Sequence, residues 1–141
     1  MTAPFPALAY RGKPALVKIS AVGTAVPSRR LTNFDLEKMV ETSDQWITER
    51  TGIKNRYIVS EGETCSDLGA KAALEACKKA GVDPKDIELI VFATITPDMM
   101  LPATACLVQH KIGAPHAWGF DLSIACSGFL YALQVGAQFI M

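Results

Sequence analysis

The feature that most constrains the fold is a nearly continuous apolar run, IELIVFATI, at residues 87–95. A short run of this kind is typical of a strand that is covered on both faces. It lies between two helical patterns, SDLGAKAALEACKKAG (66–81) and ATACLVQHKIG (103–113), and the second of these precedes a further strand pattern, HAWGFDLSIA (116–125). Strands that alternate with helices predict βαβ units, and therefore a mostly parallel sheet with helices on both faces.

The first third of the chain extends this α/β pattern. Residues 1–15 are expected to be a loose leader, and residues 16–141 a single half-domain that is incomplete at its C-terminus. LVKISAVGTAV (16–26) is rich in β-branched residues and stops before a proline, which predicts a buried strand. Two short helices are expected over 33–40 and 42–52, followed by a short extended piece over 54–60.

The start and end of the second short helix are indicated by capping residues. Thr42 is followed three residues later by Gln45, as in a capping box, and Gly52 follows the last helical residue. The predicted order is therefore strand, helices, strand, helix, strand, helix.

Composition narrows the functional classes. The chain has 141 residues and a formal net charge of zero, which gives no indication of a nucleic-acid or anionic-membrane partner. No window approaches 18 consecutive apolar residues, so no transmembrane helix is expected. The four cysteines form no CxxC pair and only two histidines accompany them, so neither a zinc site nor a disulfide framework is predicted. We expect a cytoplasmic protein with reduced thiols and no metal or redox cofactor.

Cys126 lies where the last predicted strand ends and a strongly apolar helix begins. The polar residues of that helix form one narrow stripe, which predicts a helix buried nearly all round; they are Ser127, Tyr131, Gln134 and Gln138. The N–H groups at a helix N-terminus favour a thiolate and are suited to hold the oxyanion of a thioester carbonyl. Two interpretations stay open here: a reactive nucleophile, or a small buried apolar residue.

Three segments carry a resemblance to a known family. DLSIACSGFLYAL (121–133), ETSDQWITERTGIKNR (41–56) and ATITPDMMLPATACLVQHKIGA (93–114) resemble β-ketoacyl-acyl-carrier-protein synthase III, a condensing enzyme with the thiolase fold. The order and spacing of the three agree with the family, and the resemblance covers about residues 16–141. It implies the N-terminal half of a thiolase-like fold, with the order βαβαβα.

The resemblance also implies an activity. In this family an acyl-CoA, often acetyl-CoA, transfers its acyl group to a cysteine, which here is Cys126. Malonyl-acyl-carrier protein then loses carbon dioxide, and the resulting carbanion attacks the acyl-cysteine in the reaction that initiates fatty-acid synthesis. Coenzyme A enters as a thioester substrate, no cofactor is implied, and the family works as a homodimer.

Further site residues follow from the same matches. Thr42, Trp46 and Arg50 match coenzyme A contacts, and their spacing would place them on one helix face. An indole can stack on adenine and a guanidinium can bind phosphate. Leu101 matches a loop position that reaches the partner's acyl pocket across the dimer interface. The alternatives are that Trp46 is a core residue, Arg50 a solvated charge and Leu101 part of an ordinary apolar loop.

The histidine and asparagine that assist the cysteine in this family fall after the last residue of this chain, so the chain alone is expected to be inactive. His116 lies ten residues from Cys126, about 30 Å in an extended chain, and His110 matches no catalytic position. Alternative interpretations are a priming homologue in polyketide or other secondary metabolism, another thiolase-like synthase, and a non-catalytic fragment or partner subunit. A redox role for Cys126 is disfavoured because no resolving cysteine lies near it in the sequence.

Overall fold

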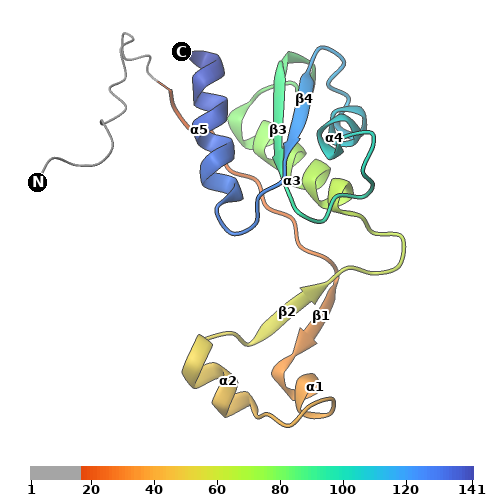
Figure 1. Cartoon of the computed structure of the whole chain (residues 1–141), viewed down its shortest axis with the longest axis vertical. Helices are drawn as coiled ribbons and strands as arrows, with labels where there is room; N and C mark the ends of the chain where they lie inside the picture. Colours follow the sequence, from red (N-terminus) through yellow and green to blue (C-terminus); the bar gives the residue numbers. More distant parts are fainter. Residues whose placement is uncertain (1–16) are drawn as a thin grey trace, which may run out of the picture.

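The computed structural model describes residues 17–141, so the expected leader at 1–15 lies outside the described residues. The helices and strands follow an α/β order (Figure 1). They are β1 (Arg29–Thr32), α1 (Asn33–Glu37), α2 (Asp44–Thr51), β2 (Asn55–Ile58), α3 (Cys65–Ala80), a 3-10 helix (Pro84–Asp86), β3 (Leu89–Ala93), α4 (Thr104–Ile112), β4 (Trp118–Leu122) and α5 (Gly128–Ile140).

The predicted βαβ unit is confirmed. Strands β3 and β4 pair in parallel, from Leu89 opposite Trp118 to Ala93 opposite Leu122, and α4 is the crossover between them. Helices α3 and α4 pack together on one face of this strand pair, and α5 contacts β3 from the other (Figure 1). The carboxyl ends of both strands therefore lie at one edge of the sheet.

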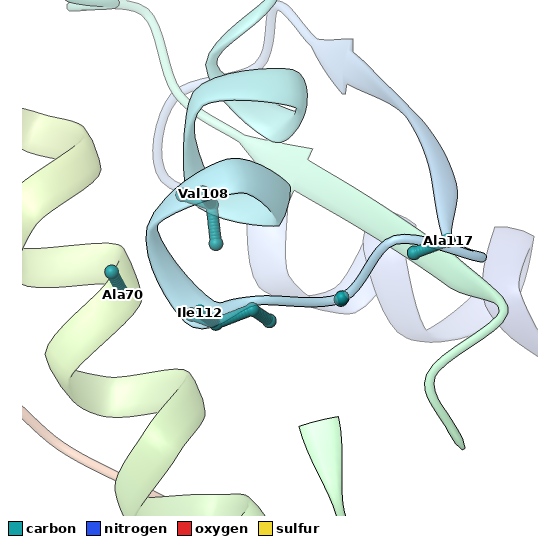
Figure 2. Packing of buried hydrophobic residues seen from close by; sticks show 5 residues of the cluster. Ala70, Val108, Ile112 and Ala117 are labelled. Carbon is teal, nitrogen blue, oxygen red and sulfur yellow. The ribbon is translucent and has the colours of Figure 1, made fainter. Parts of the chain in front are cut away.

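The core lies between α3, α4 and the strand pair (Figure 2). Its buried members are small or β-branched: Ala70, Val108, Ile112, Ala114 and Ala117. Ile90 and Phe92 of β3 pack against this cluster. A Cβ atom at Gly69 would lie 2.5 Å from the ring of Phe92, so the alanine- and glycine-rich face of α3 is what lets the helix approach β3 this closely.

The prediction of a buried strand at 16–26 is wrong for its described part, residues 17–26. This segment pairs with no other strand in the described chain, and Ile19 is 65% exposed. It runs along α3 instead: the N–H of Thr24 donates to Oε2 of Glu75 at 2.6 Å, and Lys79 donates to the carbonyl of Val22 at 3.1 Å. β-Branched residues favour an extended backbone, but a strand also requires a neighbouring strand to accept its hydrogen bonds.

A strand that the sequence did not predict is β1, which pairs antiparallel with β2 from Arg29 opposite Ile58 to Thr32 opposite Asn55. The expected extended piece at 54–60 is confirmed as β2. The two strands form a ribbon that carries α1 and α2 at one end of the molecule (Figure 1). Four residues with two arginines carry too weak a pattern for a prediction.

Helix α2 begins later than expected. Its N-cap is Ser43, whose Oγ accepts from the N–H of Trp46 at 3.1 Å, so the capping box expected from Thr42 is wrong and Thr42 lies before the helix. The expected end is confirmed, because Gly52 adopts a left-handed conformation with φ of 70° that glycine adopts without strain.

Candidate functional site

Cys126 is exposed and lies in the turn between β4 and α5. This position is at the carboxyl ends of the parallel strands β3 and β4, where ligands gather in α/β sheets. Within the described residues its side chain is not part of the core. The other cysteines are less accessible: Cys77 is buried, and Cys65 and Cys106 are partly buried.

The first turn of α5 follows Cys126 directly. The N-cap is Ser127, and no side chain caps this helix start. Gly128 is buried, and a Cβ atom there would lie 3.0 Å from that of Ala93 at the end of β3. Glycine at this position therefore lets the turn carrying Cys126 approach the strand end closely. The N–H of Gly128 donates to the carbonyl of Ala125 at 3.0 Å, and no side chain caps the N–H groups that follow.

Asp121 connects the same edge of the sheet to the loop that carries Leu101. Its two carboxylate oxygens accept from the N–H groups of Thr104 and Ala105 at 2.7 and 2.8 Å, so a residue of β4 caps α4. The loop before α4 therefore ends next to the strand that leads to Cys126. Leu101 in this loop is 85% exposed, which is not the packing of an ordinary loop on its own core.

The start of the same loop is held by α3. Asp98 accepts from the N–H of Ser66 at 3.0 Å and also from its hydroxyl, and Lys111 donates to the Ser66 hydroxyl at 2.6 Å. Burial acts to raise the pKa of Asp98, but the hydrogen bonds from Ser66 and Thr64 and the charge of Lys111 together hold that pKa below its usual value. Asp98 is therefore an anionic anchor for the segment that leads to Leu101.

A second group of expected site residues lies on and beside α2. The guanidinium carbon of Arg50 lies 4.9 Å from the centroid of the Trp46 ring, and the Trp46 side chain is 54% exposed. Thr42 and Trp46 line one shallow pocket with Glu41 and Ser43. The indole is not a core residue, and it presents an open aromatic face beside a cation.

The structure brings some of these residues together and keeps others apart. Trp46, Arg50 and Thr42 lie at the α2 end of the molecule, while Cys126 and Leu101 belong to the edge of the β3–β4 sheet (Figure 1). His110 is an exposed residue in the last turn of α4. Asp121 and Asp98 were not predicted as site residues, although a lone carboxylate inside an otherwise apolar strand pattern was a usable signal for Asp121.

Within 17–141 there is no group of three or more histidine, cysteine, aspartate or glutamate side chains placed to hold a metal ion. No helix in that range has the length and apolar character that crossing a membrane requires.

Curated proteins and solved structures resemble this chain. No protein-family model matches the chain. It is 58% identical over 123 residues to the β-ketoacyl-[acyl-carrier-protein] synthase III of Koribacter versatilis, a match that covers 87% of this chain and 37% of the relative. It is 55% identical over 124 residues to the synthase III of Solibacter usitatus, covering 88% and 38%. The chain thus spans 37% to 38% of these curated relatives' length.

Solved structures show the same relationship. The 3-oxoacyl-[acyl-carrier-protein] synthase III of Aquifex aeolicus superimposes with a TM-score of 0.83 at 50% identity, covering 87% of this chain and 40% of that one. The priming β-ketosynthase of the R1128 polyketide pathway gives 0.81 at 37% identity, covering 86% and 36%. The predicted thiolase-like α/β fold is therefore confirmed.

Proposed function

We propose that this chain is an N-terminal piece of a β-ketoacyl-[acyl-carrier-protein] synthase III. On this premise, Cys126 is the nucleophile of that condensing enzyme. One observation supports this role most directly. Cys126 is an exposed thiol at the carboxyl ends of two parallel strands, immediately before a helix start that no side chain caps. A thioester carbonyl bound there meets both a nucleophile and N–H donors.

The reaction has two steps. The Cys126 sulfur attacks the carbonyl of acyl-CoA, coenzyme A leaves as its thiol with the proton of Cys126, and an acyl-cysteine remains. Malonyl-acyl-carrier protein then loses carbon dioxide, and its C2 carbanion attacks the acyl carbonyl. The C–S bond to Cys126 breaks, which releases the β-ketoacyl-carrier protein and leaves a Cys126 thiolate, and a proton from water restores the thiol. The histidine and asparagine that assist this step in the family come from outside this chain.

The α2 end is proposed to bind coenzyme A. Trp46 offers a half-exposed aromatic face on which adenine can stack, and Arg50 beside it carries a charge that complements phosphate. Thr42 lines the same pocket as Trp46. The exposed Leu101 is proposed to enter the acyl pocket of a second copy, in a cytoplasmic homodimer that accepts acyl-CoA and malonyl-acyl-carrier protein.

Intact mass spectrometry of the full-length protein tests this function. Incubation with acetyl-CoA is expected to add one acetyl group, and the adduct is expected to be lost in Cys126→Ala. Cys106→Ala is the matched control, because Cys106 is a partly buried thiol of α4 and is expected to leave the adduct unchanged. An adduct that persists without Cys126, or none in the parent protein, would contradict the proposal.

A second candidate function is priming in polyketide synthesis. The R1128 priming β-ketosynthase shares the fold at 37% identity, whereas the synthase III relatives reach 58%. Steady-state kinetics with carrier proteins of the two pathways separate the candidates: we expect higher kcat/KM with the fatty-acid carrier protein, and the reverse order would favour the polyketide role.

A further inference from the structure

Asn33 is a fully buried polar residue in the part of the structure formed by β1, α1, α2 and β2. Its side-chain nitrogen donates to Oδ1 of Asp44 at 2.8 Å and to the carbonyl of Ile53 at 2.9 Å, with a longer contact of 3.4 Å to Oγ1 of Thr48. Its side-chain oxygen accepts from the guanidinium of Arg56 on β2. The amide of Asn33 thus contacts three places: Asp44 at the start of α2, Ile53 just after the C-cap of α2, and Arg56 on strand β2.

These contacts lie on the face of α2 opposite the Trp46–Arg50 pair. At 3.6 residues per turn, Thr48 lies about 40° around the helix from Asp44, whereas Trp46 and Arg50 lie about 200° and 240° around it. The burial agrees, because Asp44 and Thr48 are half-buried, whereas Trp46 and Arg50 are exposed. Asn33 therefore forms hydrogen bonds with the face of α2 opposite Trp46 and Arg50, and it contacts neither of those two side chains.

The partners of Asn33 depend on it. The Arg56 guanidinium has Asn33 as its only side-chain hydrogen-bond partner in the described chain, and α1 contributes no other side-chain hydrogen bond to the inner face of α2. The remaining tie between the two helices is at their exposed side, where the N–H of Asp44 donates to Oε1 of Glu37 at 2.6 Å. The angle of α2 on the ribbon is therefore set largely from one buried amide.

We propose that Asn33 is the positioning residue for the Trp46–Arg50 pair, holding α2 at the angle from which the pair binds the adenine nucleotide end of an acyl-CoA. This inference rests on the proposed function, because it takes coenzyme A as the ligand of α2. Asn33 itself contacts no ligand. Loss of its amide shifts the indole and guanidinium together, without changing either group or the reacting cysteine.

The test is Asn33→Ala in the full-length protein, with kinetics for both substrates. We expect the KM for acetyl-CoA to rise about 10- to 100-fold, the scale on which small misplacements act. We expect kcat at saturating acetyl-CoA and the KM for malonyl-acyl-carrier protein to change less than about twofold. Isothermal titration with coenzyme A measures binding without turnover, and the variant is expected to need a correspondingly higher concentration.

Thr32→Ala is the matched control. Thr32 precedes Asn33 and caps α1 through its contacts with Asp35, so its loss weakens the same region without touching α2. The KM for acetyl-CoA is expected to stay within about twofold of the parent value. If Asn33→Ala does not fold, Asp44→Ala is the second variant, because it removes the Asn33–Asp44 hydrogen bond by changing the half-buried residue of α2. We expect it to raise the KM for acetyl-CoA in the same way.

Two results would overturn the inference. One is an unchanged KM for acetyl-CoA in both Asn33→Ala and Asp44→Ala. The other is a uniform loss, in which kcat and both KM values worsen together with the melting temperature, as a merely structural role would produce. A parent protein that binds no coenzyme A would overturn the proposed function as well, whereas a parent that binds it normally beside unaffected variants overturns only the role of Asn33.

Discussion

The Nζ atom of Lys111, in the last turn of α4, lies 2.6 Å from Oδ1 of Asp67, in the first turn of α3. The hydrogen bond from Lys111 is the largest of the contacts that hold the pKa of Asp67 well below its usual value, and the second is that from Thr64. A carboxylate with a lowered pKa stabilises the folded state above its unfolded pKa, and this stabilisation is lost as pH falls towards the folded pKa.

We therefore expect Lys111→Met to lower the urea midpoint of the full-length protein at neutral pH. The deficit relative to the parent should shrink as pH falls below about 4, where the unfolded carboxyl becomes protonated. The measurement is urea unfolding across this pH range. Lys38→Met, which removes the same charge from the more exposed pair with Asp35, is the control and should change the midpoint little. An equal deficit at every pH would show that the pair with Asp67 does not titrate as described.

The close contact of Gly23 with α3 predicts a steric penalty. A Cβ atom at Gly23 would lie 1.9 Å from the carbonyl oxygen of Ala72, so Gly23→Ala must displace the 17–27 segment from the helix. We expect a loss of about 1–3 kcal/mol in the free energy of unfolding of the full-length protein. Gly136→Ala, with no atom within 4 Å of the new Cβ, is expected to be neutral or stabilising. Equal effects of the two substitutions in denaturant unfolding would contradict this packing.

The open indole of Trp46 predicts a specific loss of affinity. Trp46→Ala removes the face on which adenine is proposed to stack, so the KM for acetyl-CoA should rise about 5- to 150-fold. Gln45→Ala, on the same helix and bonded to Glu49 at 2.8 Å, is the control and should leave the KM unchanged. Isothermal titration with coenzyme A measures the effect without turnover. If Trp46→Ala binds coenzyme A with unaltered affinity, the proposal that coenzyme A binds at α2 is contradicted.

The exposed Leu101 predicts control over acyl-chain length. Leu101→Phe adds bulk at the proposed acyl pocket, so kcat/KM for a longer primer relative to acetyl-CoA should fall at least about 10-fold. Leu101→Ala should shift the same ratio in the opposite direction. Competition assays with mixed acyl-CoA primers give the ratio directly, and a ratio that neither variant moves would place Leu101 outside the pocket.

The apolar surface of α5 predicts that the 141-residue chain behaves poorly by itself. Phe129 is 67% exposed, Leu130 69% and Ile140 65% in this structure, an apolar patch that promotes association. We expect the chain expressed alone to bind a hydrophobic dye and to aggregate, and expect Leu130→Lys to reduce the aggregation. A soluble, cooperatively melting monomer of residues 1–141 would contradict this expectation.

The sequence alone determined the elements whose signals are local. The helix over 66–81 was predicted nearly to the residue, because its alanine-rich interior and Gly81, which takes a left-handed φ of 68°, specify a helix and its end within a few positions. The run at 87–95 identified β3, and the segment around Cys126 identified the family. Each of these signals is complete within a short stretch of chain.

Only the tertiary structure decided what depends on residues distant in sequence. Residues 17–26 favour an extended backbone, but whether they form a strand depends on a partner, and here α3 takes the contacts instead. The composition of α5 predicted burial on all sides, and within the described chain β3 contacts only one of them. Asn33 opens the helix expected over 33–40, and only the fold surrounds it with Asp44, Ile53 and Arg56. Strand pairing and burial each need two contacting surfaces, and a single stretch of sequence specifies only one of the two surfaces.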